Sequence, residues 1–133
     1  MKCFLLIFAA ILVLAACSGG GTSCTKVAVD GGGHIACTGS LDQLTGKQEI
    51  DFDLQDIGIG GSISAKINIT VGKGTLKITY LDGAGKSMTY IVSPAKPLAL
   101  IDELHASSNQ AEITFDSEAA TASGIHYTAE FTE

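Results

Sequence analysis

The chain has 133 residues, enough for one domain with one hydrophobic core. Its 14 acidic and 8 basic residues give a formal net charge of −6. This acidity argues against nucleic-acid binding, which needs basic side chains to neutralise phosphates, and the absence of Trp argues against a strong aromatic binding platform.

Residues 1–16 have the features of a secretory leader. Lys2 supplies a positive charge, and residues 4–16 form an uncharged apolar run of thirteen residues. A membrane-spanning helix needs roughly 20 such residues, so this run is too short to stay in the bilayer. We expect residues 1–16 to be cleaved, which leaves 133 − 16 = 117 residues.

The leader ends in a motif with its own chemistry. Leu14-Ala15-Ala16-Cys17 resembles the lipobox of bacterial lipoproteins. The resemblance implies cleavage before Cys17, a diacylglyceryl group on its thiol and an acyl chain on the new amine. Two or more chains hold a protein stably on a bilayer, which is therefore an expected partner. Residues 17–23 then form a lipidated Gly/Ser tether. Since no Asp follows Cys17, the family pattern implies the outer membrane in a Gram-negative host.

The first predicted fold element is a hairpin in "CTKVAVDGGGHIAC". Asp30-Gly31 is a strong two-residue turn signal, and such a turn places Cys24 opposite Cys37 in a non-hydrogen-bonded pair. The Cα atoms of such pairs lie about 4.5 Å apart, within disulfide range. We expect a structural disulfide, because the CxxC spacing of redox-active pairs is missing. A wider loop through the three glycines is the alternative geometry.

Alternating apolar residues then predict a series of strands. The predicted strands span 49–54, 62–71, 75–81 and 88–92, with two more near 113–115 and 125–131. Residues 62–93 are interpreted as a three-stranded meander. Residues 94–109 contain Pro94 and Pro97 and fit either a short helix or an edge strand, with extended structure favoured by the surroundings.

This pattern predicts an all-β domain over residues 24–133. We expect a single antiparallel β-sandwich of about seven or eight strands, of jelly-roll or immunoglobulin-like type. A small barrel is the alternative.

Metal and catalytic signals are weak. An acidic face forms from Glu49, Asp51, Asp53 and nearby Asp56, but the EF-hand spacing is missing, so a solvated face competes with a cation site. The dispersed His34, His105 and His126 show no metal-ligand spacing. The "GIGGS" stretch before Ile63 lacks the GxSxG nucleophile elbow. We therefore assign no catalytic, metal or cofactor residues.

One further stretch carries a resemblance. Residues 121–128, "TASGIHYT", are similar to a segment of membrane-bound inhibitors of C-type lysozyme, which are small β-barrel lipoproteins. There the Ser-Gly pair lies in a loop that enters the enzyme cleft, so Ser123 and Gly124 would be the matching residues. A simple turn before the last strand explains the same residues.

The sequence thus predicts an exported, envelope-anchored, non-enzymatic binding or structural module, with a protein or glycan partner. An inhibitor of a secreted hydrolase such as lysozyme is the second hypothesis, and an envelope enzyme is the third.

Overall fold

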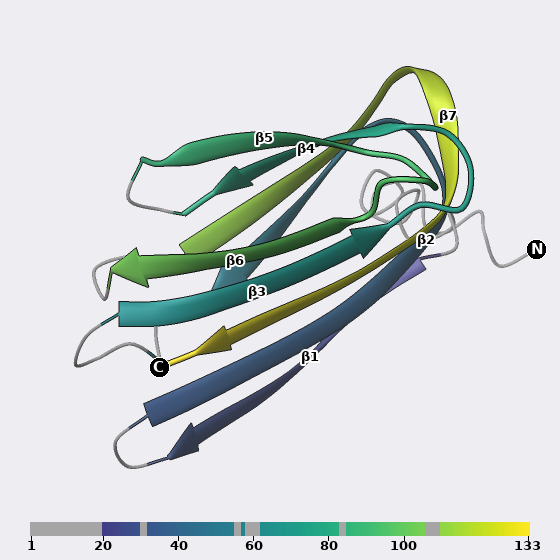
Figure 1. Ribbon diagram of the computed structural model, residues 1–133. Helices are drawn as coiled ribbons and strands as arrows, with labels where there is room; N and C mark the ends of the chain where they lie inside the picture. The colour runs from purple at the N-terminus through teal and green to yellow at the C-terminus, as the bar shows by residue number, and fades with distance from the viewer. Residues whose placement is uncertain (1–19, 30–31, 55–56, 58–61, 83–84, 106–109) are drawn as a thin grey trace, which may run out of the picture.

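A computed structural model describes residues 20–29, 32–54, 57, 62–82, 85–105 and 110–133 (Figure 1). Within these ranges the chain forms seven antiparallel strands. They are β1 Gly20–Val29, β2 Gly32–Asp53, β3 Ser62–Thr70, β4 Leu76–Leu81, β5 Ser87–Val92, β6 Leu98–His105 and β7 Gln110–Thr132. The prediction of an all-β jelly-roll sandwich is confirmed. No helix in the described ranges is long and apolar enough to cross a membrane.

The two long strands β2 and β7 organise the fold. They pair with each other and arch together from one layer into the other (Figure 1). One layer has the order β1-β2-β7-β3-β6, in which β7 contributes its C-terminal half. In the other layer the N-terminal half of β7 pairs with β4, and β4 pairs with β5. A continuous pair of strands therefore joins the two layers.

The arch occurs where, in both strands, the side chains that face the core change between odd-numbered and even-numbered positions. In β2 the buried positions change from odd to even between Leu41 and Leu44, and in β7 the change falls between Ala122 and Ile125. These residues face each other across the ladder. Gly124 has φ +64° and lies so close to Gly72 that an added Cβ would be 3.3 Å from the Gly72 Cα. Glycine tolerates both conditions, so the sheet turns its corner there.

The core lies between the layers and is mostly aliphatic. Alternate residues of β3 are buried in the pattern expected from the sequence. Phe52 packs on Phe131 and Phe115 on Tyr127, with ring centroids 5.3 and 5.2 Å apart. The core side chains therefore come from both layers and fix their separation.

The structure corrects two expectations and confirms part of a third. The predicted meander is wrong in its first step, because β3 pairs with β6 and β7 rather than with β4, whereas its second step, the β4–β5 hairpin, is present. The extended structure favoured for residues 94–109 is confirmed for Leu98–His105, which form β6, while residues 106–109 lie outside the described ranges. Residues 20–23, expected in the tether, already belong to β1 and pair with residues 38–41 of β2; residues 17–19 lie outside the described ranges.

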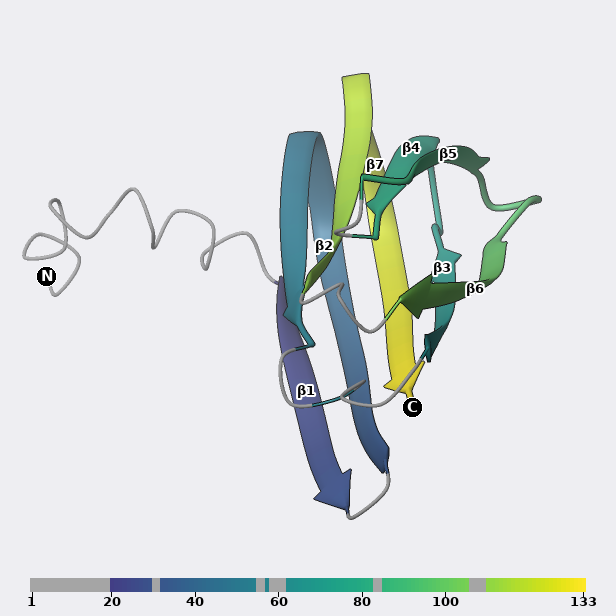
Figure 2. The ribbon, with the colours of Figure 1, turned by 90° about the vertical axis from the view of Figure 1, so that its left-hand side faces the viewer.

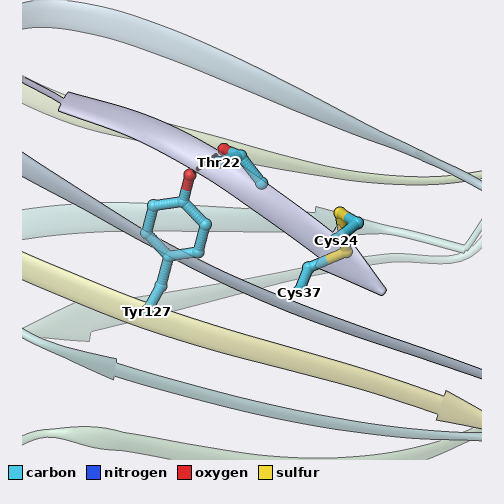
Figure 3. Close-up of a disulfide and its surroundings, with 4 residues drawn as sticks. All are labelled: Thr22, Cys24, Cys37 and Tyr127. Carbon is cyan, nitrogen blue, oxygen red and sulfur yellow. Dashed lines mark hydrogen bonds between the residues drawn. A yellow bond between two sulfur atoms is a disulfide. The ribbon is translucent and has the colours of Figure 1, made fainter. Parts of the chain in front are cut away.

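Strand β1 is the outermost strand of its layer (Figure 2). The side chains of residues 21–27 are all exposed. In addition to the ladder with β2, the Cys24–Cys37 disulfide and a hydrogen bond between the hydroxyls of Thr22 and Tyr127 hold β1 to the body (Figure 3). Gly39 gives the Tyr127 ring its space, since an added Cβ would lie 2.1 Å from the ring.

Candidate functional site

An irregularity in the β2–β7 ladder produces a hollow on the surface of the described chain. Thr45 pairs with Thr121 and Lys47 with Asp116, so four residues of β7, 117–120, stand opposite the single residue Gly46. On the other side of β7, strand β4 pairs only with residues 112–116. The backbone of residues 117–120 therefore lies outside both ladders. Bulges of this kind re-aim side chains and often lie next to functional sites.

Specific bonds hold this bulge in place. Gly46 takes φ +95°, and its N–H donates to the buried Ser117 hydroxyl at 2.8 Å. The same hydroxyl donates to the Gly46 carbonyl at 3.3 Å. Glu118 has φ +58°, an unfavourable value for a residue with a side chain, and its N–H donates to Asp116 Oδ1 at 2.7 Å. Backbone strain of this kind persists where the surroundings enforce it, often at functional sites.

The bulge forms one wall of a hollow of about 470 Å³, which we call the bulge groove. Its floor is a row of outward-facing, register-aligned residues from three strands: Ile91 of β5, Lys77 of β4 and Asp116 of β7. Lys47 of β2 extends this row, with its Nζ 4.0 Å from Asp116 Oδ2. The lining residues are Gly74, Thr75, Lys77, Ile91, Asp116, Ser117, Glu118, Ala119 and Ala120.

The groove offers three kinds of contact. Ile91 is 53% exposed, and it and the two alanines provide apolar surface. Lys77 and Glu118 provide charges of both signs. The bulged backbone provides amide and carbonyl groups outside the ladders. The two hydroxyl side chains of the lining are those of Thr75 and Ser117, and the Ser117 hydroxyl is hydrogen-bonded to Gly46.

A second polar group lies between the layers, at the margin where β5 and β6 meet. Asp102 of β6 lies opposite the buried Ala65 and points inward, with 11% of its side chain exposed. Lys86 Nζ donates to Asp102 Oδ1 at 3.0 Å, and this bond raises the lysine pKa. Asp102 Oδ2 and the hydroxyl of the buried Tyr80 have no hydrogen-bond partner in the described structure. Burial, reinforced by Asp102 and Asp82, strongly raises the Tyr80 pKa.

The predicted acidic face is present on the outer surface. Glu49, Asp51 and Asp53 are exposed on β2, and Asp51 pairs across the ladder with Glu112. Partial burial, together with Glu49 and Asp51, raises the Glu112 pKa. Among the described residues no three His, Cys, Asp or Glu side chains are grouped to hold a metal. Asp56 lies outside the described ranges.

The two histidines whose side chains are described, His34 and His126, are not brought together. His34 Nδ1 lies 2.9 Å from the Thr132 hydroxyl, at the far end of β7 from the bulge. His126 is exposed on β7, and the side chain of His105 lies outside the described set. Neither His34 nor His126 therefore contributes to the groove or to the inner polar group.

Ser123 and Gly124 lie within strand β7 at the corner of the sheet. The Gly72 N–H donates to the carbonyls of both residues at 3.0 Å, and Lys73 exchanges backbone hydrogen bonds with Ser123. The neighbouring Ala122 is buried. The segment is therefore held against the 72–73 turn and is not a protruding loop, in contrast to the arrangement that the lysozyme-inhibitor resemblance implies.

Of the two predictions made for cysteines, the disulfide is present in the structure and the lipidation is not tested by it. Cys24 and Cys37 are joined and occupy opposite positions in the ladder, with Cα atoms 4.0 Å apart (Figure 3). The two-residue loop is confirmed, because Val29 pairs with Gly32. Cys17 lies outside the described ranges, so its lipidation stays a prediction.

Sequence reasoning missed both new features. The bulge had a weak signal, since residues 116–121, "DSEAAT", interrupt the apolar alternation on either side. Asp102 had a clearer one: Leu98, Leu100 and Leu104 alternate with it on one face of the strand. A charged residue in such a series marks an inward-pointing charge.

No protein-family model and no curated protein matches the chain in sequence. Solved structures resemble it distantly. A Drosophila melanogaster CENP-C cupin domain has a TM-score of 0.34 and 8% identity, covering 80% of this chain and 74% of that one. An oxalate oxidase with the substrate analogue glycolate has a TM-score of 0.35 and 12% identity, covering 86% and 51%. An uncharacterized Listeria monocytogenes protein has a TM-score of 0.44 and 14% identity, covering 87% and 11%. These likenesses assign no family, ligand or activity.

Proposed function

We propose that the protein is an exported bacterial lipoprotein, anchored to the cell envelope through acylated Cys17, that acts as a non-enzymatic binding module. The bulge groove is the proposed binding surface, and an extended segment of an envelope protein is the proposed occupant. The lipobox of residues 14–17 supports the anchor, and the Cys24–Cys37 disulfide agrees with an oxidising compartment. If the host is Gram-negative, the absence of Asp after Cys17 favours the outer membrane.

The bulge of residues 117–120 is the observation that carries the binding role. A regular antiparallel ladder satisfies the backbone groups of a strand on both sides. Here four consecutive residues leave both ladders, and bonds from Ser117 and Asp116 maintain this departure. An extended peptide can hydrogen-bond to such backbone, place an apolar side chain against Ile91, and pair its charges with Lys77 and Glu118.

The binding proposal is tested with a photo-crosslinking amino acid at position 91 of the full-length protein in living cells. The matched control carries the same probe at Thr89, which is exposed on β5 but does not line the groove. We expect a recurrent protein adduct from position 91 and none from position 89. Equal labelling at both positions, or no adduct with normal expression, would overturn the assignment of the groove.

A filling substitution gives a second readout. Ala119→Trp places a large ring in the groove without touching the core, since Ala119 is exposed. It should abolish the adduct from position 91, whereas Thr89→Trp should leave it unchanged. An adduct that survives Ala119→Trp would show that the partner binds elsewhere.

The anchor is tested separately. Cys17→Ala should abolish metabolic labelling of the protein with a radioactive fatty acid, because the acceptor thiol is gone. Labelling that persists in this variant would sink the lipoprotein proposal while leaving the groove proposal intact.

A further inference from the structure

The outer edge of β1 faces no other strand in the part of the chain that the structure describes. Among the described strands β1 pairs only with β2. Val29 and Gly32 close a two-residue loop, so they form a hydrogen-bonded pair and the pair type alternates along β1. Cys24 and Thr22 therefore direct their N–H and C=O groups away from β2.

This edge lacks the protection that natural proteins give to open strands. Such edges are usually short, bulged, rich in charge or interrupted by Pro. Strand β1 has ten residues in unbroken register, no Pro and one charged residue, Lys26. The exposed side chains of residues 21–27 are small or medium in size, so another strand can approach closely.

The charges on the β1–β2 ribbon indicate which kind of strand can pair with the free edge of β1. The β1–β2 ribbon, residues 20–29 and 32–41, contains Lys26 and His34 but no acidic residue. The whole chain has 14 acidic residues and a net charge of −6. Two copies of this protein can therefore meet along this ribbon without repulsion between carboxylates of its strands.

The chain outside the described ranges adds a further argument. If Cys17 is acylated as proposed above, only three residues precede Gly20 after processing, too few to cover a ten-residue edge. Anchored copies also share one membrane plane, which raises their effective concentration.

We infer that β1 pairs antiparallel with β1 of a second copy across a two-fold axis normal to the sheet. Such an axis keeps each face continuous, so residues of the same parity face each other. The pairing that places Lys26 opposite Lys26 is disfavoured by repulsion. The remaining central registers place Ser23 opposite Ser23, Ser23 opposite Thr25, or Thr25 opposite Thr25.

Oxidative crosslinking of the full-length protein in cells tests this pairing. Ser23→Cys and Thr25→Cys are expressed singly and together, and one of the three combinations should give a covalent dimer. Thr89→Cys, exposed on β5, is the control and should stay monomeric. Peptide mapping verifies that Cys24 remains joined to Cys37 in every sample.

A matched pair of substitutions is then added to the cysteine variant that crosslinks. The pair tests whether backbone hydrogen bonds hold the dimer together. Thr22→Pro removes one outward N–H from each copy while sparing the β1–β2 ladder. Each hydrogen bond contributes roughly a fivefold factor, so association should fall about 25-fold. Thr22→Val loses the bond to Tyr127 but keeps the N–H, and should dimerise normally.

Two results would overturn the inference. One is the absence of a covalent dimer from all three cysteine combinations in protein that is expressed and correctly disulfide-bonded. The other is a dimer that forms equally well with Thr22→Pro. Fatty-acid labelling of the same samples reports the anchor independently, so a failure of lipidation is distinguished from a failure of pairing.

Discussion

The two edges of the larger layer are secured in different ways. At one edge β1 exposes the side chains of residues 21–27 and is tied down by a disulfide. At the other edge β6 buries Leu100 and Leu104 and points Asp102 inward to meet Lys86. An inward charge discourages a further strand from pairing with an edge. Strand β1 buries little side-chain surface, so a disulfide stabilises its attachment to the sheet. Strand β6 is stabilised by its buried leucines, so it tolerates an inward charge that disfavours pairing with a further strand.

The largest expected effect comes from removing the tie at β1. The double variant Cys24→Ser/Cys37→Ala should lower the free energy of unfolding by about 3 kcal/mol, because a short disulfide loop restricts the unfolded chain. Urea denaturation measures the change. Hydrogen exchange should accelerate in residues 20–29 far more than in β7. An unchanged midpoint and unchanged β1 protection would show that the Thr22–Tyr127 contact alone holds the strand.

An intermediate effect of opposite sign is expected at β6. Asp102→Leu removes a carboxylate whose Oδ2 is buried without a partner, and should raise the free energy of unfolding by about 1 kcal/mol. Lys86→Met should lower it, because the inward carboxylate then loses its counter-charge. Both are measured by thermal and urea unfolding. If Asp102→Leu destabilises more than Lys86→Met, the carboxylate has a favourable role beyond this ion pair.

The smallest effect is expected on the acidic face, away from both edges. The Glu112 pKa is raised in the folded protein, so folding favours its protonated form. The ionised carboxylate therefore lowers the free energy of unfolding at pH values above the raised pKa. This loss of stability disappears as the pH falls through that pKa. Glu112→Gln should therefore be more stable than the parent at pH 7, with the difference vanishing near pH 3. A difference that is constant with pH would point to packing instead of charge.

Local chemistry was predictable from the sequence. Asp30-Gly31 defined the turn, and the turn alone set Cys24 opposite Cys37. Strict alternation also identified the core face of β3. Both features depend on residues that are close together in the chain, where turn geometry and side-chain direction leave few alternatives.

Long-range pairing was not predictable in the same way. Nothing local distinguishes a β3–β4 hairpin from the observed pairing of β3 with β6 and β7, because an alternating strand fits any neighbour with a matching apolar face. The bulge has the same origin. Four residues oppose Gly46 only because Lys47 pairs with Asp116 and Thr45 with Thr121, about 70 residues away.

Tyr127 gives the molecule an optical property. The chain has no Trp, so its near-ultraviolet absorption and emission come mainly from three tyrosines. Among the described contacts, Tyr127 is the tyrosine whose hydroxyl meets β1, through Thr22 (Figure 3). Release of β1 would expose this phenol to water while Tyr80 stays enclosed by β4 and its neighbours. Tyrosine emission therefore provides an intrinsic, label-free signal for detachment of the edge strand.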